Sequence, residues 1–198
     1  MLLTERTWIH PFLNNLMDLV PADVESLVDA GCGRGIVGAL MRIYRNASRT
    51  VGLDVWQPYI NFCKHYKLYD ELYVIELGKD PLPFGNKEFE VATCVETIEH
   101  LPRNEGKELL TELERIAETV IVSTPSHFFR NDAFDENPYE RHLSRWTVTD
   151  FRERRYNVVG VGEYSFPVRS LPLPVQKLSS RIPQLFRFLL AKKNISKR

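Results

Sequence analysis

The stretch Val28-Asp-Ala-Gly-Cys-Gly-Arg-Gly-Ile-Val-Gly38 decides the fold that this chain is expected to adopt. It overlaps the apolar run over residues 25–30, which is typical of a buried strand, and it leads into an expected helix over residues 35–44. Glycines at 31, 33 and 35 let the backbone turn tightly and approach a ligand, and the following helix offers unpaired N–H groups at its start. This order of strand, glycine loop and helix predicts a binding site at the carboxyl end of the strand.

Short β-type runs alternate with helical stretches along the rest of the chain. The runs that we expect to form strands cover residues 25–30, 50–55, 72–77, 89–95, 119–123 and 157–163. A helix is predicted over 105–117 because apolar residues recur there with a period of 3.6. Residues 185–192 fit either a seventh strand or a short amphipathic helix. The alternation predicts the α/β class, with a mostly parallel sheet covered by helices.

Composition is that of a soluble protein with a core of its own. The 198 residues are 43% apolar and 26% charged, and we expect residues 1–198 to form one domain. No apolar run approaches the roughly 18–20 residues that a membrane span requires, and no secretory signal is recognisable. The three cysteines are far apart and form no CxxC pair, so a structural zinc site of the usual spacing is excluded. We therefore expect a cytoplasmic protein with reduced thiols.

The two ends of the chain differ from the middle. Residues 1–24 are expected to form an N-terminal helical segment, with a helix over 7–19 that covers or gates the binding site. No acidic residue follows Glu163, whereas eight basic residues do, so residues 164–198 form a basic C-terminal segment. Such a segment can attract an anionic surface or an acidic partner, or it can be a solvated tail. We also expect it to supply the last strand.

The glycine loop differs from the dinucleotide-binding fingerprint in two respects. The GxGxxG pattern requires a glycine at position 36, where this chain has Ile36. Asp29, two residues before the first glycine, would repel a pyrophosphate but suits a ligand that carries an ammonium group and a sulfonium. Asp54 ends the second expected strand, where a carboxylate can accept hydrogen bonds from ribose hydroxyls. These residues predict a nucleoside-binding half whose ligand lacks phosphates.

In this order and spacing, the motifs resemble those of class I S-adenosylmethionine (SAM)-dependent methyltransferases over roughly residues 25–166. The glycine loop resembles their motif I, and Asp54 matches their ribose-binding acid. The resemblance continues through Leu82-Pro-Phe84, Phe89-Glu-Val91, Glu96-Thr-Ile-Glu-His-Leu101 and Ser123-Thr-Pro-Ser126. It implies a Rossmann-like three-layer sandwich, whose mostly parallel seven-stranded sheet has its last strand antiparallel. It also implies SAM as the cofactor and a methyl acceptor as the second partner.

The resemblance implies a set of cofactor-binding residues, which are Asp29, Gly31, Cys32, Gly33, Gly35, Asp54, Val55, Gly78, Lys79 and Glu96. The chain departs from the family at the adenine. An acidic residue usually lies there, at the end of the third strand and a few residues before the LPF-like motif, whereas counting back from Leu82 gives Gly78. Backbone amides near Gly78 and Lys79, or a displaced Asp80, are the alternatives for this contact.

A second group of titratable residues follows the fourth expected strand. A helical turn would bring Glu96, Glu99 and His100 onto one face, at the sheet edge where α/β proteins bind ligands. His142, in a polar loop over residues 137–146, is expected to fold over the same pocket. Such a group can orient a substrate, act as a general base, bind a divalent metal, or cap the turn. We take His100 and His142 as candidate catalytic residues and assign no residue to a metal.

The sequence is compatible with two types of methyltransferase, which differ in the acceptor that they methylate. The arrangement resembles that of small-RNA 3′-end 2′-O-methyltransferases, which bind a metal through two glutamates and a histidine after the fourth strand plus a later histidine. A Glu-His pair in this place also occurs in small-molecule methyltransferases that need no metal. Because the chain is shorter than the RNA enzymes, with no evident RNA-binding extension, we expect a small-molecule acceptor. A metal-dependent RNA 2′-O-methyltransferase-like enzyme and a non-catalytic SAM-binding module are the alternatives.

Overall fold

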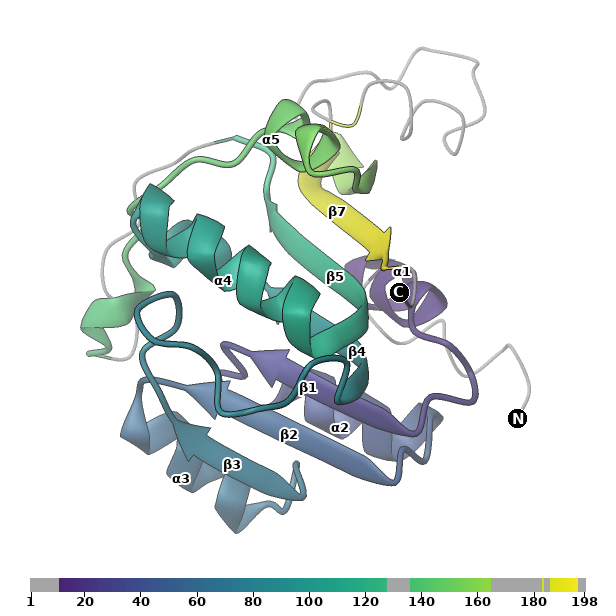
Figure 1. Ribbon diagram of the computed structural model, residues 1–198, viewed down its shortest axis with the longest axis vertical. Helices are drawn as coiled ribbons and strands as arrows, with labels where there is room; N and C mark the ends of the chain where they lie inside the picture. The colour runs from purple at the N-terminus through teal and green to yellow at the C-terminus, as the bar shows by residue number, and fades with distance from the viewer. Residues whose placement is uncertain (1–10, 128–135, 165–182, 184–185, 196–198) are drawn as a thin grey trace.

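The computed structural model describes residues 11–127, 136–164, 183 and 186–195, and these residues are built around a seven-stranded sheet (Figure 1). The strands are β1 (Ser26–Ala30), β2 (Arg49–Asp54), β3 (Glu71–Val74), β4 (Phe89–Val95), β5 (Ala117–Pro125), β6 (Asn157–Tyr164) and β7 (Phe186–Asn194). Their order across the sheet is β3-β2-β1-β4-β5-β7-β6. The first five strands pair in parallel, and β7 lies antiparallel to both β5 and β6. The predicted Rossmann-like architecture with an antiparallel last strand is confirmed.

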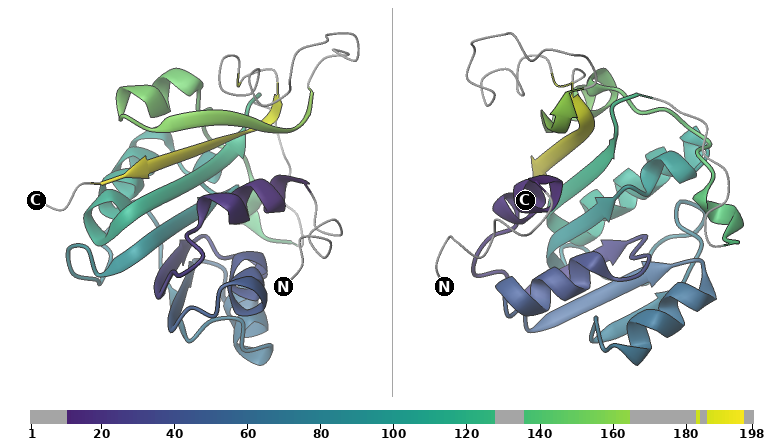
Figure 2. Two further views of the ribbon diagram at one scale, coloured as in Figure 1. Left: turned by 90° about the vertical axis from the view of Figure 1, so that its right-hand side faces the viewer. Right: turned by 180° about the vertical axis from the view of Figure 1, so that it is seen from behind.

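Helices cover both faces of the sheet, so the molecule has three layers (Figure 2). One face carries α4 (Arg103–Ile116) and α5 (Val148–Glu153), and the other carries α1 (Pro11–Leu19), α2 (Ile36–Tyr44) and α3 (Gln57–His65). Two short 3₁₀ helices, η2 (Ile98–His100) and η3 (Pro138–Glu140), lie in the connections after β4 and β5. The first of these connections and the β1–α2 turn meet at the carboxyl ends of the parallel strands, where open α/β sheets bind ligands.

Burial of apolar faces holds the layers together. The apolar residues of α4 recur on one side, and Leu109, Leu113 and Ile116 are fully buried against the sheet. On the opposite face, α1 and α2 contribute Leu16 and Met41 to a second core cluster. A fully buried leucine or methionine side chain contributes about 1.5–3 kcal/mol.

The structure departs from the expected elements in two places and decides a third that was left open. Strand β3 ends at Val74 rather than at residue 77, so residues 75–77 leave the sheet toward its carboxyl edge. Helix α3 was not predicted from the sequence, although three of its nine residues, Tyr59, Ile60 and Cys63, form a buried face. Residues 185–192 were open between strand and helix, and β7 resolves the choice in favour of a strand paired on both sides. The expected helix over 7–19 is present over 11–19, and residues 1–10 lie outside the described part.

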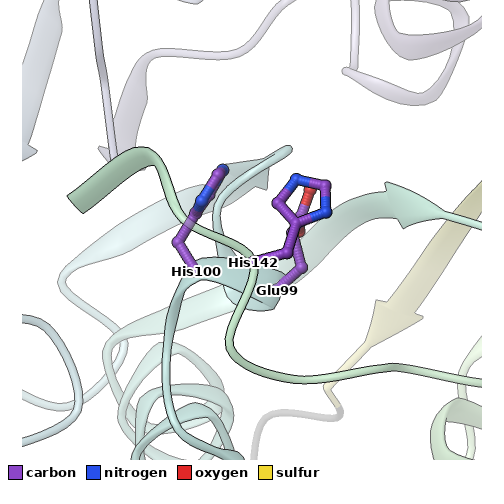
Figure 3. Close-up of side chains that lie close together, drawn as sticks. All are labelled: Glu99, His100 and His142. Atoms are coloured by element: carbon purple, nitrogen blue, oxygen red, sulfur yellow. The ribbon is translucent and has the colours of Figure 1, made fainter. Parts of the chain in front are cut away.

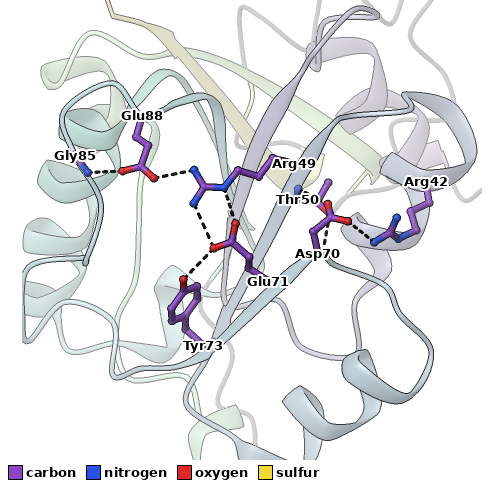
Figure 4. A network of polar contacts seen from close by, with 8 residues as sticks. All are labelled: Arg42, Arg49, Thr50, Asp70, Glu71, Tyr73, Gly85 and Glu88. Atoms are coloured by element: carbon purple, nitrogen blue, oxygen red, sulfur yellow. Dashed lines mark hydrogen bonds and ion pairs between the residues drawn. The ribbon is translucent and has the colours of Figure 1, made fainter.

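A polar network covers the edge of the sheet at the start of β2 and β3 (Figure 4). The Arg49 guanidinium pairs with the Glu71 carboxylate at 2.6 Å and with the Glu88 carboxylate at 2.8 Å. Beside it, one Asp70 oxygen accepts hydrogen bonds from the amide and hydroxyl of Thr50, both at 2.7 Å. These groups lie at the amino ends of the strands, opposite the ligand-binding edge, so their role is structural.

Three of the eight basic residues after Glu163 lie in the described part of the chain, and each has a partner there. Arg187 lies over the Phe188 ring, Lys192 Nζ donates to the Leu19 carbonyl at 2.9 Å, and Lys193 pairs with Glu114 at 2.8 Å. The attraction of this segment to an anionic surface stays a prediction. None of the helices in the described residues combines the length and the apolarity that crossing a membrane requires.

Candidate active site

The turn after β1 has a backbone conformation that only glycine adopts readily. Gly31, Gly33 and Gly35 have φ angles of 77°, 51° and 79°, in the left-handed region. A Cβ at Gly31 would overlap the Thr97 side chain, and one at Gly35 would lie 2.6 Å from Leu68 Cδ1. The amides of Gly31 and Cys32 both donate to the Leu53 carbonyl at 2.8 Å. The turn is thus held against the end of β2.

Asp54, the last residue of β2, fastens the same turn through its side chain. One carboxylate oxygen accepts from the Gly33 amide and the other from the Trp56 amide, both at 2.8 Å. Burial raises the pKa of Asp54, and the two amides oppose this shift because they stabilise the ionised form. The two hydrogen bonds therefore fix the direction of the Asp54 carboxylate, which lies at the carboxyl edge of the sheet, where such folds bind ligands.

Asp29, near the end of β1, is a second buried carboxylate. Its two oxygens accept hydrogen bonds from the Thr93 hydroxyl at 2.7 Å and from the Tyr69 hydroxyl at 2.6 Å. Burial raises the pKa of Asp29 to about 7, and the nearby Asp54 adds to the increase, while the two hydroxyls oppose it. A cation bound beside Asp29 would favour its ionised form.

A cavity of about 450 Å³ opens over these two carboxylates at the carboxyl edge of the sheet. Eight of the ten residues that the resemblance implies for the cofactor line it, namely Asp29, Gly31, Cys32, Gly33, Asp54, Val55, Lys79 and Glu96. Gly35 and Gly78 are not among its lining residues. At Gly78, φ is 77° and a Cβ would overlap the Glu105 backbone, so close packing already accounts for this glycine. The contact of these two glycines with the cofactor stays a prediction.

Glu76 is a lining residue that the sequence analysis missed. It follows β3 by two residues, because β3 ends early and the chain bends along the cavity over Ile75–Gly78. Its carboxylate pairs with Lys79 Nζ at 2.8 Å, so the acid and the base lie together on the cavity wall. The sequence analysis did place Glu76 in the third expected strand. Counting back from Leu82, however, selected Gly78 as the position near the adenine.

The end of the cavity that contains His100 is built by η2, the start of α4 and the loop that contains η3. Its lining residues include His100, Leu101, Pro102, Asn137, Tyr139, Glu140 and Leu143. The Asn137 side chain accepts from the Tyr139 amide at 3.0 Å, and Tyr59 Oη donates to Glu140 at 3.2 Å, which ties the loop to α3. This end combines apolar side chains with an imidazole and a carboxylate.

Glu99, His100 and His142 lie side by side at this end (Figure 3). One ligand atom from each lies within 4.8 Å of the others, and the two imidazole rings are 4.9 Å apart. Glu99 is buried and accepts from the Thr124 hydroxyl at 3.0 Å, and burial raises its pKa well above the usual value. Burial, followed by the neighbouring His142, lowers the pKa of His100 to about 4. The imidazole of His100 is thus neutral at physiological pH.

The two expected catalytic histidines are brought together, but they do not face the same space. His100 lines the main cavity, whereas His142 lines a small adjoining pocket with Glu99 and Trp146. Trp146 is buried and donates to the Ile98 carbonyl at 3.2 Å, so it holds the loop on η2. The loop lies against η2, but His142 does not line the same pocket as His100, as the sequence analysis expected it to do.

The expected position of Glu96 on a shared helical face is wrong. Glu96 has a φ of 50° and precedes η2, so it lies outside the turn that carries Glu99 and His100. It lines the cavity and accepts from the Ser123 hydroxyl at 2.8 Å. Burial raises its pKa to about 7. A left-handed conformation at a non-glycine residue carries strain, and such strain is concentrated at functional sites.

Comparison with known proteins relates the chain to methyltransferases. Residues 28–119 match the family model of a methyltransferase domain. Over 142 residues the chain is 30% identical to a fatty-acid O-methyltransferase of Mycolicibacterium smegmatis. The matched region covers 69% of this chain and 49% of the relative. The chain thus spans about half the length of that relative.

Solved structures with similar folds are more distant in sequence. The PH0226 protein of Pyrococcus horikoshii has a TM-score of 0.66 at 16% identity, covering 98% of this chain and 92% of that one. The methyltransferase domain of bacterial CtHen1 has a TM-score of 0.61 at 20% identity, covering 93% and 95%. The Synechocystis magnesium protoporphyrin IX methyltransferase, solved with bound S-adenosylhomocysteine (SAH), has a TM-score of 0.58 at 12% identity, covering 93% and 80%.

Proposed function

This chain contains a class I SAM-dependent methyltransferase domain, and we propose that it transfers the methyl group of SAM to an oxygen atom of a small apolar acceptor. One observation carries the proposal. A single cavity is lined by two buried carboxylates, which we call the cofactor end, and by an imidazole among apolar side chains, which we call the acceptor end. A ligand with a ribose and an ammonium group fits the first end, and an apolar acceptor fits the second.

The residues at the cofactor end suit SAM in both charge and position. Asp54 offers carboxylate oxygens at the end of β2 for the ribose hydroxyls, and Asp29 offers a negative charge for the ammonium group. When bound, SAM supplies a sulfonium methyl group that a nucleophile can take by direct displacement. The protein contributes by holding the two reactants in line and by excluding water from the cavity.

His100 is the residue that we assign to the acceptor. Its Nδ1 lies 3.2 Å from the Arg141 carbonyl, so a proton on Nδ1 would be donated there and Nε2 would be left as the acceptor nitrogen. A pKa of about 4 makes this imidazole a weak base. Its Nε2 can accept a hydrogen bond from the O–H of a hydroxyl or carboxylic acid acceptor and so position that oxygen. The name of the fatty-acid O-methyltransferase relative supports an apolar carboxylic acid as the first acceptor to test.

Incubation of the purified protein with methyl-tritiated SAM tests this function. The acceptor panel would contain long-chain fatty acids, simple phenols and a short RNA duplex, with His100→Ala as the matched control. We expect organic-extractable label with the fatty acids and a strong loss of it in the variant. Label in the RNA alone, or in none of the acceptors, would contradict the proposed small-molecule acceptor.

A metal-dependent RNA 2′-O-methyltransferase is the second candidate, and the Glu99–His100–His142 group favours it. The group combines a buried carboxylate with two imidazoles, a set of ligands that can bind a divalent transition metal. His100 is neutral, as an imidazole ligand must be. Glu96 lies outside this group, so the donor set is smaller than the one expected from the sequence. Manganese-dependent labelling of the RNA duplex, lost in His142→Ala, would favour this candidate over the first.

A further inference from the structure

Tyr69, in the connection between α3 and β3, reaches Asp29 from outside the glycine loop. Its side chain is buried, with 5% of its surface exposed. Its hydroxyl donates to Asp29 Oδ2 at 2.6 Å and accepts from the Gly38 amide, in the first turns of α2, at 3.0 Å. One phenol therefore joins the start of the helix to the carboxylate at the end of the neighbouring strand.

Two glycines leave the space that the Tyr69 ring occupies. A Cβ at Gly38 would lie 2.6 Å from Tyr69 Cζ, and a Cβ at Gly52 would lie 2.9 Å from Tyr69 Cδ2. Neither glycine has a positive φ, so backbone conformation does not require glycine at these positions. The close approach of the aromatic ring accounts for both, together with the Leu68 carbonyl at Gly38 and the Leu72 side chain at Gly52. The last glycine of the stretch over residues 28–38 therefore accommodates Tyr69 rather than a bound ligand.

The hydrogen bonds fix the direction in which Tyr69 donates. A phenol has one proton, and the Gly38 amide already donates to its oxygen, so the proton points to Asp29. Thr93, the residue opposite Asp29 in the β1–β4 pairing, donates to the other carboxylate oxygen at 2.7 Å. Two hydroxyls from two elements therefore hold the carboxylate on both of its oxygens.

We propose that Tyr69 is a positioning residue for the cofactor, which keeps the Asp29 carboxylate ionised and oriented toward the ammonium group of SAM. This inference rests on the proposed use of SAM. Tyr69 is not among the residues that line the cavity, so it acts on the ligand through Asp29. Without it, the cavity would keep its shape but would lose negative charge at the point where the amino-acid part of the ligand binds.

The electrostatic surroundings explain why a hydroxyl is needed there. Burial holds the pKa of Asp29 near 7, Asp54 is a like charge close by, and the surrounding thiols of Cys32, Cys63 and Cys94 offer no positive charge. Tyr69 and Thr93 are the side chains that lower the pKa of Asp29. Removal of one hydroxyl raises that pKa further, so that the Asp29 side chain is mostly protonated at neutral pH.

Calorimetric titration of Tyr69→Phe with two ligands tests the inference. SAH carries the ammonium group, whereas 5′-methylthioadenosine has the same nucleoside without the amino-acid part. At pH 7 we expect SAH to bind the variant about tenfold more weakly than the wild type, since a hydrogen bond to a charged group is lost. Binding of 5′-methylthioadenosine should be unchanged. At pH 8.5 the difference for SAH should shrink, because Asp29 ionises again.

Two further variants keep the test decisive. Tyr73→Phe removes a hydroxyl that donates to Glu71 at 2.9 Å on the exposed sheet edge, and it should bind both ligands as the wild type does. Thr93→Val removes the other donor to Asp29 and should repeat the selective loss of SAH if Tyr69→Phe does not fold.

Three outcomes would overturn the inference, and they differ in what else they overturn. Wild-type SAH affinity in Tyr69→Phe would show that the hydroxyl has no role in cofactor binding. An equal loss of both ligands would show that Tyr69 is structural only. Failure of the folded wild type to bind SAH would overturn the proposed function itself.

Discussion

The two ends of the cavity are built in different ways. At the cofactor end, Asp29 and Asp54 lie near the carboxyl ends of two neighbouring strands, and every carboxylate oxygen accepts a hydrogen bond from the folded chain. At the acceptor end, η2 meets a loop that returns about forty residues later, and Tyr139 and Leu143 are exposed. The cofactor end is therefore fixed by the fold itself. The acceptor end depends on a loop whose side chains can change at little cost to stability.

The backbone of that loop is nevertheless held in place. The amides of Leu143 and Ser144 both donate to the Glu99 carbonyl, at 2.8 and 3.0 Å. His142 directly precedes these two residues, which explains why its ring lies beside His100. The loop thus presents fixed main-chain positions with variable side chains, an arrangement that allows acceptor specificity to change while the histidine pair stays in place.

The largest effect should follow from Asp54→Ala, which breaks the cofactor end. The change removes the proposed ribose contact and leaves the Gly33 and Trp56 amides without their acceptor. Loss of hydrogen bonds to a charged group predicts roughly a 100-fold weaker SAH affinity, to be measured by calorimetry. Asp70→Asn, at the opposite edge of the sheet, is the matched control and should bind SAH normally. Unchanged SAH affinity in Asp54→Ala would remove Asp54 from the site.

His100→Ala should separate the two ends. Because we assign His100 to the acceptor and not to the cofactor, we expect turnover with the acceptor found in the panel to fall about 100-fold, while SAH affinity stays within about twofold of the wild type. Initial rates and calorimetry on the same preparation check both halves of the prediction. A variant with wild-type turnover would contradict the assignment of His100 to the acceptor.

Acidification should weaken the cofactor end selectively. The ionised form of Asp29 binds the ammonium group, so SAH affinity should fall as pH drops through about 7, by roughly tenfold for each unit below it. The stability of the ligand-free protein should change with pH in the opposite direction. A raised carboxyl pKa favours the protonated folded state, so the Asp29 contribution to the stability of the ligand-free protein is lost as pH rises through 7.

Asp29→Asn isolates this contribution, because Glu96 also has a raised pKa of about 7. The variant should show a flatter dependence of both SAH affinity and unfolding temperature on pH between 6 and 8. A variant that keeps the wild-type pH dependence of SAH binding would assign that dependence to another group.

The smallest effect is expected at the far edge of the sheet. Arg49→Lys removes the bidentate pairing with Glu71 but leaves a positive charge between Glu71 and Glu88. Because this network is partly exposed, the free energy of unfolding should fall by less than about 1 kcal/mol. Urea unfolding measures the change, and SAH affinity should not move. A loss of SAH binding would mean that the two edges of the sheet are coupled.

The sequence predicts the cofactor end far better than the acceptor end, because most residues of the cofactor end belong to short, continuous motifs. Gly31, Gly33 and Asp54 act through backbone turns and strand ends, which short motifs encode directly. Tyr69 was missed because it contacts Asp29 from forty positions away, across α2 and β2. Glu76 was missed because β3 ends three residues earlier than its apolar run suggests.

At the acceptor end, the sequence identified the residue types but not their geometry. The juxtaposition of His100 and His142 was predicted from their positions after two strands of one sheet edge, and the structure brings them together. The helical turn expected to carry Glu96 does not include it, because Glu96 takes a left-handed conformation before η2. No residue-type pattern predicts such a conformation at a glutamate.

The central claim is that the two buried carboxylates bind SAM, and titration of the wild type and Asp54→Ala with SAH tests it most directly. The account predicts micromolar-range binding to the wild type, with one site for each chain, and a roughly 100-fold loss in the variant. Absence of SAH binding to a wild-type protein that is shown to be folded would contradict it.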